Sequence, residues 1–462
     1  MKKYDLVVIG SGPGGEKAAT KAAHFGYKVA VIEKAKTFGG AGVNTGTLPS
    51  KTLKEAALYF SGKYDKGLYG VDRQLQHHAS VEEFMYRKNF IVNTQSDSVF
   101  QNLVRHKVEV FWGEGTFIDQ HTLEVKGDFG SETLVADKII IATGSYPVHF
   151  PNIPFDNQRV HDSDSILEIT RFPASICVVG AGVIGCEYAT IFAAMGAKVY
   201  LVNRTEQIMP FIDKEVTDEL VDQMKRDGIE LIFNTSLKEL HSPKTDREFL
   251  RVGLEDDVWL HVDMFLLAAG RNGNTKSLGL EKVGIPVDKR ELLTVNAHFQ
   301  TAVPHIYAVG DVIGFPSLAN TSMDQGRLAV AHMFSTGDLD HLYTALPFGV
   351  YTIPEVSTVG ISEEEAQKQG INYGIGKAYH SKMSRGKILG AEHGFLKMVY
   401  RKDDLVIIGV HIIGHMACEL IHYGMTLVED KKTVRDVIAV VFNYPTLHDL
   451  YKYAAYDALN GV

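Results

Sequence analysis

The sequence predicts an α/β protein with two Rossmann-like units. Each unit is indicated by a short apolar run that leads into a GxGxxG glycine pattern and then into a stretch with helical character. The first reads YDLVVIGSGPGG, from Tyr4 to Gly15, and the second reads ICVVGAGVIG, from Ile176 to Gly185. Because the chain has 462 residues, of which 45% are apolar, it is long enough for about three domains with packed cores.

Composition and charge argue against several kinds of partner. The formal net charge of −9 at pH 7 disfavours nucleic acid and anionic membranes. Lys2 and Lys3 precede only a short apolar run, so we expect no signal peptide, and no apolar run approaches the roughly 20 residues of a membrane span. Cys177, Cys186 and Cys418 form no CxxC pair, and such low usage is compatible with a reducing cytosol. We therefore expect a soluble, cytoplasmic protein in which Cys177 and Cys186 are packing residues.

The first glycine loop predicts a dinucleotide site. Bare amides at the start of the helix that follows it, together with the helix dipole, favour a pyrophosphate. A second apolar run ends at Glu33, about 20 residues beyond the first glycine, where a carboxylate can bind the ribose hydroxyls of an adenine nucleotide. The predicted contacts of this site are Gly10, Gly12, Gly14, Gly15, Glu33 and Lys34.

A helical excursion and further strands follow this unit. Ser80 and Glu83 form a capping-box pattern, and the residues after them recur at helical spacing along one face. Because Lys88 and Gln95 are polar positions on that face, we expect one edge of the face to be exposed to solvent. Residues 108–117 and 122–126 then predict short strands, and KIIIATG, from Lys138 to Gly144, returns to the sheet.

The second glycine loop, with Gly180, Gly182 and Gly185, predicts the site of a nicotinamide nucleotide. Its next strand ends in Asn203 and Arg204, where an acid would bind the ribose diol of NAD and repel the 2′-phosphate of NADP. A neutral amide followed by a guanidinium can accept either nucleotide. We therefore predict use of both NAD and NADP, with an ordinary surface charge as the alternative role of Arg204.

The same unit continues with a predicted helix and strand. The helix runs from Asp213 to Asp227 and is closed by Gly228, and the strand covers residues 229–233. The segment DMFLLAAG, which ends at Gly270, then leaves the domain.

The segment FGGAGVNTGTLPSK, from Phe38 to Lys51, resembles the active-site pattern GGxCxNxGCxPSK of the pyridine nucleotide-disulfide oxidoreductases. Gly42 and Thr47 occupy the two cysteine positions, so a thiol relay cannot run here. The resemblance implies FAD as cofactor of the first site. It places Gly40 and Lys51 against the flavin, Thr143 and Gly144 beside FAD, Gly270 at the exit from the second domain, and Gly310 and Asp311 at the ribityl chain.

The C-terminal residues resemble the dimerisation domain of the same family, which implies a homodimer with an α+β third domain. Tyr444 and Asp449 stand where the disulfide reductases carry the His and Glu that serve their thiols, so the thiol base is missing together with the thiols. His411 and His415 predict a strand and turn, and we expect no metal there. The resulting division is an FAD-binding domain of residues 1–150 and 272–345, an NAD(P)-binding domain of residues 151–271, and a dimerisation domain of residues 346–462.

Within the family, the chain is most similar to the soluble pyridine nucleotide transhydrogenases, in HDSDSIL, GAGVIGCEYATIF, AVGDVIGFPSLA and FNYPT. The resemblance implies that NADPH or NADH gives a hydride to FAD and that the other nucleotide takes it from the same site. Lys51 would lie near the flavin and pair with Glu187, although a purely structural ion pair is the alternative. Tyr444 would close the far face of the flavin, unless it only packs.

Other functions stay open beside this one. They are an NAD(P)H oxidoreductase for a quinone or another small acceptor, a non-enzymatic flavoprotein that senses nucleotide redox state, and a decayed reductase kept for its structure. A disulfide reductase such as a lipoamide dehydrogenase is disfavoured by the missing cysteines.

Overall fold

The computed structural model describes residues 1–462 except 66, 70–74, 76–78, 244, 246, 247, 339, 340, 342, 343, 461 and 462. The chain forms two compact units. One consists of Met1–Thr52, Met85–His149 and Ala269–Leu342, and the other of Leu53–Phe84, Phe150–Ala268 and Tyr343–Val462. Residues 53–84 thus belong to the second unit, whereas the sequence placed them in the FAD-binding domain. The division into three domains stays a prediction.

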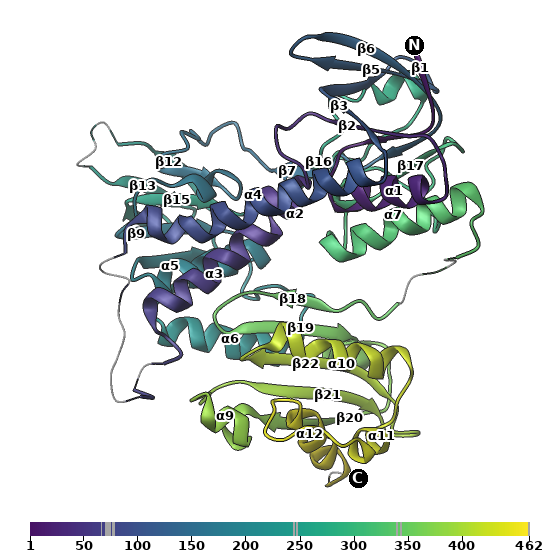
Figure 1. The fold of residues 1–462 in the computed structure, drawn as a ribbon. Helices are drawn as coiled ribbons and strands as arrows, with labels where there is room; N and C mark the ends of the chain where they lie inside the picture. The colour runs from purple at the N-terminus through teal and green to yellow at the C-terminus, as the bar shows by residue number, and fades with distance from the viewer. Residues whose placement is uncertain are drawn as a thin grey trace. The chain divides into compact units, whose positions relative to one another are not determined.

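The first unit is built on a mostly parallel sheet with the strand order β3-β2-β1-β6-β5-β4, in which β17 also pairs with β6 (Figure 1). Its central strand β1 has alternate side chains in two separate cores: Val7 and Ile9 in one, Leu6 and Val8 in the other. A strand buried on both faces is typical of a parallel sheet covered on both sides. The strands are β1 (Lys2–Ile9), β2 (Val29–Glu33), β3 (Glu109–Trp112), β4 (Glu114–Phe117), β5 (Thr122–Gly127), β6 (Gly130–Ile141) and β17 (Ile306–Ala308).

Helices α1 (Pro13–His24) and α7 (Ala319–Phe334) pack side by side. Their close approach requires glycine, because a Cβ on Gly326 would lie 2.3 Å from the Gly14 carbonyl oxygen. The unit also contains α2 (Gly40–Asn44), the hairpin of β7 (Ser145–Pro147) with β16 (Arg271–Gly273), η2 (Leu280–Val283) and η3 (Gly310–Ile313).

Helix α3 (Thr47–Ser61) and helix α4 (Val81–Arg105) form the predicted excursion. The capping box before α4 is confirmed: the Ser80 N–H donates to Glu83 Oε2 at 2.8 Å, and the Glu83 N–H donates to Ser80 Oγ at 3.1 Å. The prediction of a solvent-exposed edge is wrong for Lys88, which is 3% exposed, and is confirmed for Gln95, which is exposed. A long aliphatic stem can be buried along apolar surface, so one lysine on a helical stripe does not mark its solvent edge.

The second unit contains a parallel sheet with the order β11-β10-β9-β15-β8. Helices α5 (Val183–Ala194) and α6 (Lys214–Arg226) belong to it, and a meander of β12, β13 and β14 follows. Cys177 and Cys186 are fully buried here, which confirms them as packing residues. The bounds are β8 (Val160–Asp162), η1 (Ser165–Glu168), β9 (Ser175–Val179), β10 (Lys198–Val202), β11 (Glu230–Ile232), β12 (Leu237–His241), β13 (Leu250–Leu254), β14 (Trp259–Val262) and β15 (Met264–Leu267).

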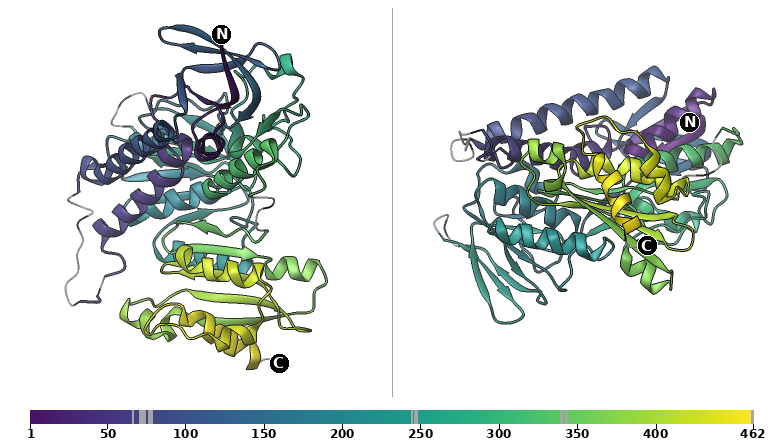
Figure 2. Two further views of the ribbon diagram at one scale, coloured as in Figure 1. Left: turned by 45° about the vertical axis from the view of Figure 1, so that its right-hand side comes forward. Right: turned by 90° about the horizontal axis from the view of Figure 1, so that it is seen from below.

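The same unit ends in an antiparallel sheet of order β18-β19-β22-β21-β20, against which helices α10 and α12 lie (yellow in Figure 2). His411 lies on β22 and His415 in the turn after it, as predicted. No described helix is long and apolar enough to cross a membrane. The bounds are β18 (Phe348–Val350), β19 (Glu355–Gly360), α8 (Glu363–Lys368), β20 (Tyr373–Tyr379), η4 (His380–Lys382), α9 (Ser384–Ile388), β21 (Phe395–Arg401), β22 (Ile407–Gly414), α10 (Ala417–Glu429), α11 (Val434–Ala439) and α12 (Asp449–Asn460).

Candidate functional site

The first glycine loop is shaped by contacts that only glycine allows. Gly10 has a φ of +103°, and a Cβ on Gly15 would lie 2.0 Å from the Gly10 carbonyl oxygen. A Cβ on Gly14 would lie 2.9 Å from the Ser322 carbonyl oxygen. Gly12 is the N-cap of α1 and supplies no side chain to its amides. Loop and helix together therefore present bare N–H groups that suit a pyrophosphate.

Glu33 lies at the end of β2, beside this loop. Its Oε2 accepts hydrogen bonds from the Ser11 N–H at 2.9 Å and the Ser11 hydroxyl at 2.6 Å, while Oε1 accepts the Ala35 N–H at 2.8 Å. The carboxylate is only 7% exposed, and Lys34 after it is exposed. Glu33 thus fixes the loop as well as standing where a ribose would be bound, a role that sequence reasoning missed together with Ser11.

The segment in which the family carries its two cysteines lies directly on the same loop. Gly40 opens α2, and its Cβ would lie 2.9 Å from the Gly12 Cα. At Gly42, a Cβ would lie 2.8 Å from Cγ of Pro13 and 3.4 Å from its Cδ. A side chain at position 42 would therefore require the Pro13 ring to shift, and Thr47 begins α3 at the other cysteine position.

Two buried polar atoms beside this loop lack a hydrogen-bond partner, namely Thr143 Oγ1 and Asn44 Oδ1. The amide nitrogen of Asn44 donates to the carbonyls of Phe38 and Gly40, each at 2.9 Å, which fixes the orientation of the orphaned oxygen. Buried polar atoms are nearly always hydrogen-bonded. The two orphans, the bare helix start and the neighbouring Gly144, where a Cβ would meet open space, fit a polar cofactor such as FAD.

Asp311 lies in η3 and accepts a hydrogen bond from the Ser145 hydroxyl at 2.8 Å. Arg271 donates to the same hydroxyl and to the Ser145 carbonyl, each at 2.9 Å. The Gly310 N–H donates to Gln325 Oε1 at 2.8 Å. Ser145, directly after the ATG segment, and Gln325 thus orient the predicted ribityl contacts. No local sequence pattern indicates this, because Ser145 and Asp311 are 166 residues apart in the chain.

The second glycine loop repeats the geometry of the first. Gly180 has a φ of +106°, and a Cβ on Gly185 would lie 1.8 Å from the Gly180 carbonyl oxygen. Gly182 is the N-cap of α5, again without a side-chain cap, and a Cβ there would meet open space. The start of α5 therefore also offers free amides to an anionic group.

Asn203 directly follows β10, and it takes the place in the second unit that Glu33, the last residue of β2, has in the first. Its Oδ1 accepts the Ala181 N–H at 3.1 Å, and its Nδ2 donates to the Thr205 carbonyl at 2.9 Å. The amide is thus used by its own loop, while Arg204 is exposed. A Cβ at Gly270, before β16, would meet open space.

Glu187 lies on α5 and is 2% exposed. Its Oε1 accepts the Tyr351 N–H at 2.9 Å, and one turn further along the helix Thr190 Oγ1 accepts the Ile353 N–H at 3.2 Å. Lys51, on α3, donates to the Ser50 hydroxyl at 3.3 Å. The pairing of Lys51 with Glu187 stays a prediction.

Tyr444 is 69% exposed, and its hydroxyl lies 2.6 Å from Ser384 Oγ. It is therefore not a core residue of a single chain. Its predicted position against the flavin stays a prediction.

Comparison with known proteins agrees with this arrangement. The family model for pyridine nucleotide-disulphide oxidoreductases matches residues 4–326, and the model for the dimerisation domain of these enzymes matches residues 346–455. A soluble pyridine nucleotide transhydrogenase of Mycobacterium tuberculosis is 41% identical over 100% of this chain and 98% of its own length. One of Pectobacterium atrosepticum is 39% identical over 99% and 98%.

Solved structures show the same fold. LpdA from Mycobacterium tuberculosis has a TM-score of 0.90 at 25% identity and covers 99% of both chains. The HOCl-induced flavoprotein disulfide reductase RclA from Escherichia coli has a TM-score of 0.87 at 26% identity and covers 99% of this chain and 100% of its own. The chain therefore belongs to the pyridine nucleotide-disulphide oxidoreductase family.

Proposed function

We propose that this protein transfers hydride between NADPH and NAD⁺ with FAD as its cofactor and without a redox-active disulfide. One observation carries the proposal: both glycine loops keep the geometry of dinucleotide sites, while the two thiol positions hold Gly42 and Thr47. The full-length similarity to proteins named soluble pyridine nucleotide transhydrogenases supports it.

The residues of the first unit have the task of holding FAD. The amides of the first glycine loop bind the pyrophosphate, Glu33 fixes that loop and meets the ribose, and Asp311 is held by Ser145 toward the ribityl chain. Thr143 and Asn44 supply the partnerless polar atoms that a bound cofactor would satisfy. The chemistry that FAD supplies when bound is the storage of one hydride, taken from one nicotinamide and given to the other.

The residues of the second unit select and orient the nicotinamide nucleotide. The loop from Gly180 to Gly185 binds the pyrophosphate, and exposed Arg204 meets the 2′-phosphate of NADP, while no carboxylate at position 203 repels it. Both nucleotides then use one site in turn. Lys51, which we predict to pair with Glu187, would hold a positive charge beside a bound flavin and stabilise negative charge on it.

We further propose a cytoplasmic homodimer that acts without a nucleic acid or membrane partner. The match of residues 346–455 to a dimerisation domain supports the dimer, as does the exposure of Val441 (91%) and Tyr444 (69%) on one C-terminal segment. Three buried free cysteines and a net charge of −9 are compatible with a reducing compartment and with the absence of polyanionic partners.

Anaerobic stopped-flow spectroscopy tests the proposal. The protein-bound flavin is reduced with one equivalent of NADPH and then mixed with NAD⁺ while its absorbance is followed. We expect reoxidation at a rate that supports steady-state turnover. A flavin that stays reduced until a quinone is added would instead indicate an acceptor oxidoreductase, and a flavin that NADPH hardly reduces would indicate a sensor.

A further inference from the structure

The loop between β10 and α6 carries Asn203 and Arg204, the two residues that we predict to discriminate between NAD and NADP. It begins at Asn203 and ends at Asp213, the N-cap of α6. Asn203 anchors its first end to the Ala181 N–H of the glycine loop. Between the ends, the Met209 N–H donates to the Ala181 carbonyl at 3.3 Å. Arg204 directly follows the first anchor, and the loop that carries it ends at Asp213.

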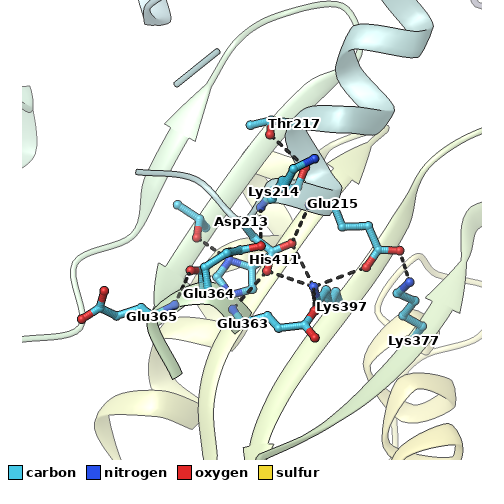
Figure 3. A network of polar contacts seen from close by, with 12 residues as sticks. Asp213, Lys214, Glu215, Thr217, Glu363, Glu364, Glu365, Lys377, Lys397 and His411 are labelled. Atoms are coloured by element: carbon cyan, nitrogen blue, oxygen red, sulfur yellow. Dashed lines mark hydrogen bonds and ion pairs between the residues drawn. The ribbon is translucent and has the colours of Figure 1, made fainter. Parts of the chain in front are cut away.

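Asp213 fixes the second end with a fully buried carboxylate. Its Oδ1 accepts the Glu215 N–H at 3.2 Å and caps α6, and its Oδ2 accepts the Glu363 N–H at 3.2 Å, at the start of α8. The ammonium of Lys397 lies 3.0 Å from both carboxylate oxygens. Figure 3 shows these groups converging on Asp213 from α6, α8 and strand β21.

Lys397 is itself fully buried on β21 and also contacts Glu363 at 2.6 Å and Glu215 at 3.3 Å. Burial by itself would lower the pKa of this lysine, but its hydrogen bonds with Glu363 and Asp213 raise the pKa above the ordinary value. It is therefore charged at neutral pH. At the rim of the cluster, Lys377 contacts Glu215 as well.

His411 also lies in this cluster and is neutral. Burial lowers its pKa, its Nε2–H donates to the Ile361 carbonyl at 3.0 Å, and its Nδ1 accepts the Thr358 hydroxyl at 2.6 Å. We assign this tautomer from the partners, because a carbonyl can only accept. Lys397 is therefore the group that neutralises Asp213.

A buried ion pair of this kind is weak evidence for stability, since desolvation of two charges offsets most of their attraction. What it does enforce is position: the carboxylate must stay where its three donor groups, the two backbone N–H groups and the Lys397 ammonium, meet. We propose that Lys397 is a positioning residue for nucleotide selection, which holds the loop from Asn203 to Asp213, and with it Arg204, in the place that reads the 2′-phosphate. This inference rests on the proposed function of Arg204.

The direction of the effect follows from the two anchors. Asn203, near the ribose, is tied to the glycine loop and does not depend on Asp213. Arg204 meets the 2′-phosphate through a charge-assisted contact that requires exact placement of the guanidinium. Releasing Asp213 should therefore weaken NADPH binding more than NADH binding.

The test replaces Lys397 with methionine and compares both nucleotides in the FAD-loaded dimer. We expect the Kd of NADPH, from the dependence of the flavin reduction rate on nucleotide concentration, to rise about tenfold relative to that of NADH, with the reduction rate at saturation unchanged. Lys377→Met is the matched control, because it removes a lysine that contacts the same helix start but not Asp213. Its Kd ratio should equal the parental one.

Two further variants keep the test decisive. Because Lys397→Met leaves a buried charge unpaired and can prevent folding, Asp213→Asn combined with Lys397→Met removes both charges and keeps an N-cap side chain. It should show the same tenfold change. Arg204→Ala by itself should raise the ratio of the NADPH Kd to the NADH Kd. Adding Lys397→Met to Arg204→Ala should raise this ratio no further.

The outcomes separate the two ideas. If Arg204→Ala leaves the ratio unchanged, the role of Arg204 is wrong. If Arg204→Ala changes the ratio but the double variant of Asp213 and Lys397 does not, or if the effects of Arg204→Ala and Lys397→Met simply add, Lys397 does not position the reading loop.

Discussion

Replacing Gly185 with alanine should abolish tight nicotinamide-nucleotide binding while leaving FAD bound. The new Cβ would lie 1.8 Å from the Gly180 carbonyl oxygen, whereas ordinary contact begins at 3.4 Å. Bond-angle strain cannot absorb such an overlap, because a deviation of about 7° already costs about 1 kcal/mol. The glycine loop and the start of α5 must therefore move apart.

The expected loss is larger in binding than in stability. Overpacking costs about 1–3 kcal/mol, and the higher helix propensity of alanine offsets part of this cost. The displaced loop no longer presents its amides to the pyrophosphate, and each lost hydrogen bond to a charged group costs about 1.5–3 kcal/mol. One lost contact therefore raises the Kd by about 10- to 150-fold.

Titration of the bound flavin with NADPH measures this Kd, and the absorbance ratio of flavin to protein measures FAD content. Gly182→Ala is the control for stability in the same loop. Its Cβ would meet open space, so the variant should have the parental Tm. Gly15→Ala is the counterpart in the first loop, with an overlap at 2.0 Å, and should lose FAD instead. A Gly185→Ala protein whose Kd stays within twofold of the parental value would refute the reasoning.

Three further predictions follow from the same geometry. Glu33→Gln should lower FAD content, because a carboxamide oxygen cannot replace both carboxylate oxygens that hold the Ser11 and Ala35 amides; full FAD content would contradict this. Gly42→Cys with Thr47→Cys should yield no NADPH-reducible disulfide, measured by thiol titration after reduction, because a Cβ at position 42 would lie 2.8 Å from Cγ of Pro13 and could enter only if that ring shifted. Burial, followed by the neighbouring charges of His380 and Lys54, lowers the pKa of His415 to about 4. Between pH 6.5 and 4 the unfolded chain therefore binds a proton at this residue more readily than the folded chain does. The free energy of unfolding should fall by up to about 3 kcal/mol as the pH is lowered through this range. In denaturant unfolding, His415→Gln should reduce that pH dependence, and an unchanged slope would show that other groups cause it.

The sequence predicted the features that depend on short-range patterns. The glycine loops, the end of β2 at Glu33, the capping box at Ser80 and the strand and turn around His411 and His415 are each encoded within a dozen residues. Lys88 was misjudged because periodicity reports the face of a helix and says nothing of what covers that face.

Contacts between distant residues were out of reach of such patterns. Nothing near Asp213 in the sequence points to Lys397, and nothing near Asp311 points to Ser145, because tertiary packing alone brings them together. Which side chains meet the cofactors remains a prediction for Lys51, Glu187 and Tyr444.

The burial of the three cysteines affects how this protein reacts with oxidants. All three cysteines of the chain are buried and none stands at the family's thiol positions, and burial raises the pKa of Cys177 to about 12. Peroxide and hypochlorous acid attack thiolates, so a protein with almost no accessible thiolate is a poor target for them. We therefore expect this flavoprotein to keep working in a cell whose thiol-dependent reductases are being inactivated.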